Sequence, residues 1–184
     1  MVNIKLSIIS LVLLSGCGYM GKRSIYGLPR KKFKAFDYVR LKSDIIDTNA
    51  IYKLEVNFFV NGKENRDTTY ERDDKNKYRY TSYLQFYNSG KVGLFIIHDE
   101  DTAKLTRSHF NPQKAKMGYY KIEGSNKLYT RSSTIGSSLM LIMNNSGYIK
   151  KDSIFLKNDK VNYGHIYIKK VVDPQLLSDW KPDW

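Results

Sequence analysis

Residues 78–99, YRYTSYLQFYNSGKVGLFIIHD, contain two runs rich in aromatic and β-branched side chains on either side of Asn88, Ser89 and Gly90. Such runs favour strands, and a glycine between them can take the positive φ that a tight hairpin turn needs. This stretch therefore predicts a β-hairpin, and it carries the strongest hairpin signal in the chain.

Further strands are predicted on both sides of this hairpin. Residues 50–60 alternate with the period of two typical of a strand that has one buried face. The inner face predicted for that strand carries Tyr52, Leu54, Val56, Phe58 and Val60. Residues 63–77 are polar and predict a long loop, with a short strand near 68–72. Two more hairpins are predicted in residues 117–133, turning at 124–126, and in residues 138–157, turning at 145–147; a last strand is expected at 163–171.

The number and spacing of these strands indicate the fold class. Beyond the first 20 residues no long segment has a helical period, although residues 173–180, DPQLLSDW, could form one helical turn. Eight or nine strands favour an antiparallel sandwich or an up-and-down barrel. Consecutive hairpins would leave unpaired edges in an open sheet, so we expect an all-β, antiparallel barrel of about eight or nine strands. A barrel of this size is filled by side chains or holds one small ligand.

The first 20 residues, MVNIKLSIISLVLLSGCGYM, contain the chain's only cysteine, Cys17. One positive charge, Lys5, precedes an apolar run over residues 6–14, which is too short for a spanning helix of about 20 residues. The pattern predicts a cleaved signal peptide over residues 1–16. The ending LSGC resembles the lipobox of bacterial lipoproteins, which implies acylation of Cys17 by chains such as palmitate. An ordinary signal peptide that contains a cysteine is the alternative.

The charge distribution adds to this expectation. The formal net charge is +13, and residues 18–42 alone hold eight Lys or Arg and one Asp. A basic segment beside a lipid anchor is attracted to anionic headgroups by up to about 1 kcal/mol per residue. We therefore expect residues 17–45 to be a lipidated basic tether, which either contacts lipid or is simply solvated. Nucleic acid is not an expected partner, because an exported chain rarely meets it.

The order of these features resembles that of the uncharacterised lipocalin-like lipoproteins of Bacteroidota. The resemblance rests on the lipobox at Cys17 and on four segments: IDTNAIYKLEV (46–56), LQFYNSGKVGLF (84–95), NPQKAKMGYYKIEGSNKLY (111–129) and WKPDW (180–184). It implies a lipocalin-like β-barrel over residues 46–184. The G-x-W signature of true lipocalins is missing, since the first tryptophan is Trp180. We expect DWKPDW (179–184) to form an aromatic strap across the barrel's end or side, with a loose tail as the alternative.

Catalytic and metal-binding patterns are weak. His98, Asp99, Glu100 and Asp101 could offer ligands to a divalent cation, but neighbours on a strand point to opposite sides, and we expect a solvated loop. None of the three histidines lies in a catalytic motif such as G-x-S-x-G. With Cys17 acylated, no thiol remains for catalysis or metal binding. The sequence predicts no enzyme, no metal site and no cofactor.

The aromatic content points instead to a binding cavity. The chain has 15 Tyr and 8 Phe, and tyrosine combines a large apolar surface with a hydroxyl that can bond a ligand. The residues expected to line such a cavity are Tyr78, Tyr80, Phe86, Tyr163, His165 and Tyr167. Which strand faces point inward stays open at this stage.

Three functional hypotheses follow. The first is a lipid-anchored, non-enzymatic binder of a small apolar or amphipathic ligand. The second is a structural or assembly accessory of the outer membrane that docks an envelope protein. The third is a hydrolase that uses His98 and its acidic neighbours. The residues after Cys17 lack an acidic run resembling the surface-export tag of Bacteroidota lipoproteins, so we expect an outer-membrane anchor that faces the periplasm.

Overall fold

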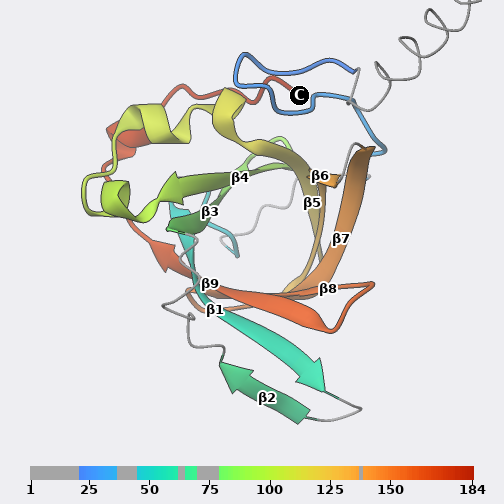
Figure 1. The fold of residues 1–184 in the computed structure, drawn as a ribbon. Coiled ribbons are helices and arrows are strands. Elements are labelled where there is room, and N and C mark those ends of the chain that lie inside the picture. Colours follow the sequence, from blue (N-terminus) through green and yellow to red (C-terminus); the bar gives the residue numbers. More distant parts are fainter. Residues whose placement is uncertain (1–20, 37–44, 62–64, 70–78, 137–138) are drawn as a thin grey trace, which may run out of the picture.

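A computed structural model describes residues 21–36, 45–61, 65–69, 79–136 and 139–184 (Figure 1). The described residues form nine strands: β1 Ile51–Asn61, β2 Asn65–Thr69, β3 Tyr80–Tyr87, β4 Lys91–His98, β5 Lys116–Glu123, β6 Lys127–Gly136, β7 Leu139–Lys150, β8 Ser153–Asn158 and β9 Tyr163–Lys170. Short 3-10 helices lie between β4 and β5 (η1 Asp99–Ala103, η2 Arg107–Phe110, η3 Pro112–Lys114) and after β9 (η4 Pro174–Leu176). Within these ranges, no helix has the length and apolar character needed to cross a bilayer.

The predicted all-β barrel is confirmed. Strands β1 and β3–β9 pair in an antiparallel series, and β1 also pairs with β9, so the sheet closes on itself with eight strands. In Figure 1 these strands form a ring, and β2 extends from it as a partner of the far end of β1. Closure satisfies the main-chain groups that an open sheet would leave at its edges.

The first two predicted hairpins are confirmed in their turns. β3 and β4 pair up to Tyr87 and Lys91, and Gly90 takes a φ of 74°. β5 and β6 turn at residues 124–126, and Gly124 takes a φ of 61°. Glycine carries no Cβ and so adopts these backbone angles without steric cost.

The predicted turn at residues 145–147 is wrong. β7 continues through Gly147 to Lys150, and the chain turns at Lys151 and Asp152 instead. Gly147 lies opposite Leu156, and a Cβ on it would collide with the carbonyl oxygen of Phe155. This glycine is therefore explained by the close approach of β8 rather than by a turn.

The predicted inner face of the first strand is correct only at its start. Tyr52 and Leu54 belong to the inner cluster, but the pairing with β9 shifts between Leu54 and Val56. One extra residue in a strand exchanges its two faces beyond that point. Asn57 consequently pairs with His165, and Phe58 covers Gly164 on the opposite face.

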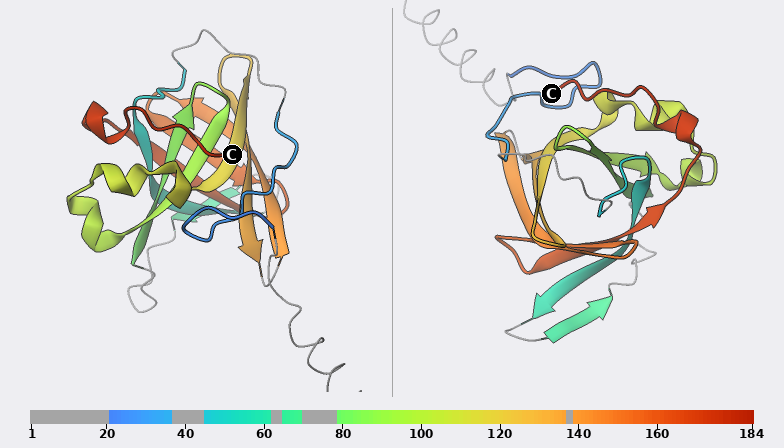
Figure 2. Two further views of the ribbon diagram at one scale, coloured as in Figure 1. Left: turned by 90° about the horizontal axis from the view of Figure 1, so that it is seen from above. Right: turned by 180° about the vertical axis from the view of Figure 1, so that it is seen from behind.

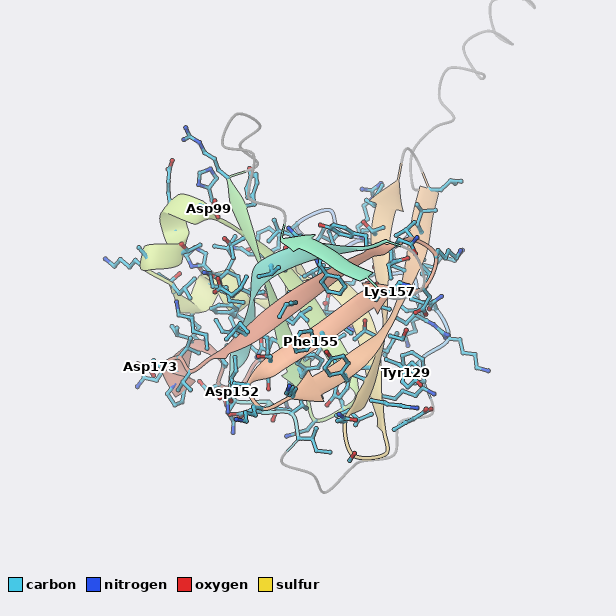
Figure 3. The ribbon with its side chains drawn as sticks, turned by 90° about the horizontal axis from the view of Figure 1, so that it is seen from below. Asp99, Tyr129, Asp152, Phe155, Lys157 and Asp173 are labelled. Atoms are coloured by element: carbon cyan, nitrogen blue, oxygen red, sulfur yellow. The ribbon has the colours of Figure 1, made fainter. Side chains whose placement is uncertain are left out.

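One side of the barrel is covered by other segments. In Figure 2 the 3-10 helices after β4, the C-terminal residues and the segment 21–36 lie over one side of the ring. Outward side chains of β3, β4 and β5 pack there with η2, the C-terminal residues and Phe33. Trp184 is buried there, and its indole N–H donates to the carbonyl of Gly118 at 3.1 Å. Along β8, Phe155 and Lys157 point away from the barrel and are half-buried (Figure 3).

The described part of the expected tether is packed against the barrel. Phe33 contacts Tyr119 edge to face at 5.2 Å, and the carbonyl of Lys34 accepts a hydrogen bond from Arg131 at 2.8 Å. This differs from a freely solvated tether, because aromatic residues between the lysines of this segment supply apolar surface that the outer wall buries.

Candidate functional site

The inner face of the barrel divides into two halves. One half is filled by a buried apolar cluster, which comprises Ile46, Tyr52, Leu84, Phe86, Val92, Tyr120, Leu128, Ile149, Ile154, Leu156 and Tyr167. Phe86 is completely buried, with its ring edge to face against Tyr52 at 5.4 Å and Tyr120 at 4.9 Å. This apolar half is a close-packed core, in which Phe86 presents no surface to a ligand.

The other half, which we call the open half, exposes apolar side chains on the same inner face. Ile96 follows Val92 and Leu94 at even positions of β4, and Met143 and Leu141 lie opposite Ser132 and Thr134 of β6. Directly opposed residues share a face of a sheet. Ile96, Leu141 and Met143 are nevertheless 44%, 49% and 37% exposed. Inward-facing apolar groups that remain in contact with water are typical of a ligand site.

A row of polar side chains borders the core and the open half. Asn145 donates from its amide to Thr130 at 3.1 Å, and it accepts from the amide of Asn158 at 3.2 Å. Thr130 and Asn158 are buried, while Asn145 is half-buried. The row spans β6, β7 and β8, so it crosses the inner wall at one level.

The polar row is continued by His165 on β9, the strand that pairs with β8. Its Nδ1 lies 2.7 Å from Oδ1 of Asn57, and its ring meets that of Tyr163 edge to face at 4.8 Å. Burial lowers the pKa of His165 to about 4, so the imidazole is neutral near pH 7. A neutral imidazole that donates from Nδ1 keeps Nε2 as an acceptor.

The six residues expected to bind a ligand are only partly brought together. Tyr163, His165 and Tyr167 are consecutive on the inner face of β9, with the His165 and Tyr167 ring centroids 5.8 Å apart. Tyr80 begins β3, is half exposed and packs its ring against His98 at 5.1 Å. Phe86 lies in the apolar half, and Tyr78 falls outside the described residues.

The acidic stretch after β4 is arranged as a helix cap. Asp99 accepts from the hydroxyl of Thr81 at 2.6 Å, and Glu100 pairs with Arg79 at 3.0 Å. Nδ1 of His98 accepts from the main-chain N–H of Glu100 at 3.4 Å. Across the parts of the chain that the structure describes, no three His, Cys, Asp or Glu side chains gather as metal ligands would.

Sequence reasoning missed the polar row and the exposed apolar residues. The alternation in residues 50–60 predicts Asn57 on the outer face, and the β1 bulge that turns it inward leaves no mark in a hydrophobicity pattern. The run Asn-Ser-Gly at residues 145–147 predicts a turn, since all three residue types favour turns, and this prediction hides the inward position of Asn145. The alternation of Leu139, Leu141 and Met143 in β7 was the available signal, but it does not say which alternate set is inside.

In comparisons with known proteins, no protein family, no curated protein and no solved structure matches the chain.

Proposed function

We propose that the protein is a lipid-anchored lipoprotein of the cell envelope whose barrel binds one small amphipathic ligand without transforming it. In this role, residues 1–16 are a cleaved leader, Cys17 is acylated, and the protein is held at the outer membrane facing the periplasm. The observation that carries the binding role is the open half, where Ile96, Leu141 and Met143 stay exposed on the inner face.

The chemistry of the open half favours a ligand with an apolar body and a polar group. Burying one exposed aliphatic side chain completely is worth about 1.5–3 kcal/mol, so the apolar residues supply affinity. His165 and the row of Thr130, Asn145 and Asn158 supply hydrogen bonds. Lys116, which is half-buried opposite Leu94, adds a cation on the same face and favours an anionic polar group.

A matched pair of charge substitutions tests this role. Met143→Glu places a carboxylate in the open half, whereas Ile135→Glu places one at a similarly exposed residue on the outer face of the neighbouring strand. An anionic amphipathic dye such as anilinonaphthalene sulfonate is titrated into the purified protein, and its fluorescence is recorded. We expect Met143→Glu to weaken dye binding at least tenfold and Ile135→Glu to leave it unchanged.

Mass spectrometry of an organic extract adds a second readout, because a natural ligand would be recovered from the unsubstituted protein and lost from Met143→Glu. Equal dye binding by both variants, with nothing recovered in the extract, would remove the binding role. The alternative, an accessory that docks an envelope protein, would then be favoured, since the close-packed apolar half is what a purely structural barrel needs.

A further inference from the structure

Residues 22–30 form a compact loop with its own hydrogen bonds. Arg23 and Pro29 form a β-bridge at its base, and Ser24 N–H donates to the carbonyl of Leu28 at 2.8 Å. The hydroxyl of Ser24 also accepts from Leu28 N–H, and Gly27 takes a φ of 77° at the tip. The loop therefore has a defined shape, and its tip consists of residues 25–27.

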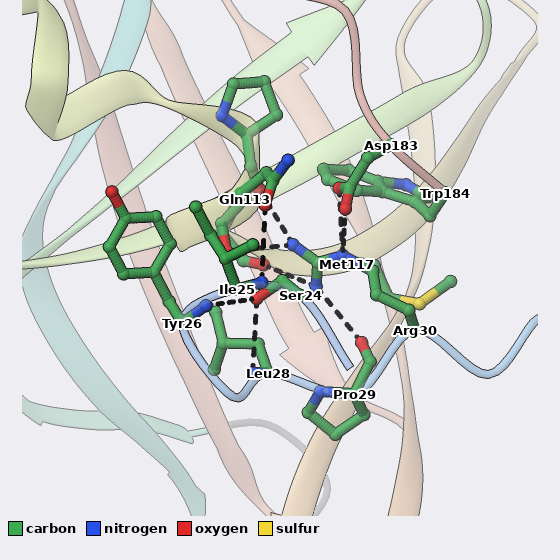
Figure 4. A network of polar contacts seen from close by, with 12 residues as sticks. Ser24, Ile25, Tyr26, Leu28, Pro29, Arg30, Gln113, Met117, Asp183 and Trp184 are labelled. Carbon is green, nitrogen blue, oxygen red and sulfur yellow. Dashed lines mark hydrogen bonds and ion pairs between the residues drawn. The ribbon is translucent and has the colours of Figure 1, made fainter. Parts of the chain in front are cut away.

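Arg30 fastens this loop to the barrel (Figure 4). Its side chain is almost wholly buried and pairs with Asp183 at 2.9 Å. The remaining guanidinium N–H groups donate to the main-chain carbonyls of Pro29, Pro112, Gln113 and Ala115. All five donors of the guanidinium are thus used, which is what a buried arginine requires. The loop cannot leave the barrel surface without exposing these groups.

The tip of this fixed loop is apolar and solvent-exposed. Ile25 is 77% exposed, and about half of the neighbouring Tyr26 is exposed. The ammonium of Lys114 lies 5.3 Å from the Tyr26 ring centroid. An isolated exposed apolar residue is common on protein surfaces and would by itself indicate nothing. The charged residues that flank this loop in the sequence indicate what kind of surface the tip contacts.

Cations flank the loop in the sequence. Lys22, Arg23, Lys31, Lys32 and Lys34 are exposed, and residues 18–36 contain no Asp or Glu. An apolar and aromatic tip flanked by cations matches the membrane interface, where tyrosine favours the headgroup level and each Lys or Arg near an anionic surface is attracted. Charge complementarity therefore selects anionic lipid headgroups.

The covalent distance to the proposed anchor agrees with this assignment. Three residues lie between Cys17 and Gly21, where the described part of the chain begins, so the two are four residue steps apart. Even a fully extended chain spans at most about 3.6 Å per residue, so acylation of Cys17 would hold Gly21 within roughly 14 Å of the cysteine. The loop would then lie beside the leaflet that holds the acyl chains.

We propose that residues 22–30 are a membrane-contact surface, with Ile25 and Tyr26 inserted among anionic headgroups and the flanking cations bound to them. This inference rests on the proposed acylation of Cys17. Because Arg30 fixes the loop to the barrel, the contact also fixes which side of the barrel faces the bilayer. The covered side, with η3 and the C-terminal residues, lies toward the lipid.

A fluorescent label at the tip tests the contact in the full, acylated chain. Ile25→Cys is labelled with an environment-sensitive dye, and Val161→Cys serves as the control, because it is exposed in the β8–β9 loop on the opposite side of the molecule (Figures 1 and 2). Each protein is added to vesicles of phosphatidylcholine alone or mixed with phosphatidylglycerol, with a quencher attached to the acyl chains.

We expect the dye at residue 25 to shift to shorter wavelength and to be quenched at least twofold more in the anionic vesicles than the dye at residue 161. Adding Lys31→Glu and Lys32→Glu to the labelled protein should abolish the difference between the two vesicle compositions. Far-ultraviolet circular dichroism that matches the unsubstituted protein shows that the labelled variants are folded.

Other outcomes separate this inference from the proposed anchoring. Protein that sediments with vesicles while both dyes respond equally overturns the contact surface and leaves acylation intact. Protein that does not sediment overturns the anchoring, and the contact surface with it. A dye at residue 25 that responds to detergent-solubilised envelope proteins but not to lipid assigns the loop to a protein partner and overturns the membrane contact.

Discussion

His165 and Asn57 are joined by a 2.7 Å contact between Nδ1 and Oδ1, across the two strands whose pairing closes the barrel. The contact depends on the β1 bulge, because without the extra residue Asn57 would face outward. The pairing of β1 with β9 therefore both closes the sheet and places Asn57 beside His165 on the inner wall.

Acid should weaken the fold through His165. Its pKa is about 4 in the folded chain against a usual value of 6.5, so the unfolded chain takes up a proton first. The free energy of unfolding is expected to fall by about 3 kcal/mol as the pH drops from 6.5 to 4, and this contribution should not fall further below pH 4. Urea unfolding at a series of pH values measures the slope.

Two variants identify the group responsible for that slope. His165→Gln can keep a hydrogen bond to Asn57 without titrating, and it should flatten the slope between pH 4 and 6.5. Asp47→Asn should not, since the hydrogen bond from Lys169 lowers the pKa of Asp47 below 3.8, and its contribution is lost only at lower pH. An unchanged slope in His165→Gln would contradict the assignment.

Gly147→Ala should be strongly destabilising. The added Cβ would meet the main-chain oxygen of Phe155, which cannot move without separating β7 from β8. We expect a loss of at least about 3 kcal/mol in the free energy of unfolding, or an insoluble chain.

Gly124→Ala is the matched control for that substitution. It strains a positive φ but meets open space, so it should cost about 1–2 kcal/mol. Equal losses for Gly124→Ala and Gly147→Ala, measured by urea unfolding, would show that the close strand approach at Gly147 is unimportant.

Arg30→Met should cost about 3–5 kcal/mol, because it leaves Asp183 and four main-chain carbonyls without their buried donor. Lys32→Met, two residues along on the solvent side, should change the free energy of unfolding by less than about 0.5 kcal/mol. Chemical denaturation of both proteins gives the comparison. A cost for Arg30→Met no greater than that of Lys32→Met would mean that the Arg30 network does not hold residues 22–30 in place.

The two tryptophans should differ in their contribution to stability. Trp184 is buried and bonded to Gly118, so Trp184→Ala is expected to cost about 3–5 kcal/mol. Trp180 is half-buried, with Arg107 4.5 Å from its ring, and Trp180→Ala should cost about half as much. With one indole left in each variant, emission should lie at shorter wavelength for Trp184 than for Trp180. The reverse order would contradict the packing of the C-terminal residues.

Local chemistry was sufficient to predict the strands and two of the turns. The alternation in residues 78–99 and the glycines at 90 and 124 fix the backbone within a few residues, and such signals do not depend on distant partners. Gly147 shows the limit of this reasoning. The Asn-Ser-Gly run at residues 145–147 predicts a turn, yet the absence of a Cβ on glycine also permits close strand contact, and only the position of β8 distinguishes the two.

Side-chain period and main-chain hydrogen bonding were enough to predict alternating strands whose edges are satisfied by closure. The three-dimensional pairing of the strands decided which face lines the barrel, through a bulge that brings Asn57 to His165, 108 residues away. The tertiary structure also decided that the segment of residues 21–36 packs on the wall, since Arg30 finds Asp183 across 153 residues. Contacts over such separations depend on the three-dimensional path of the chain, which no local pattern records.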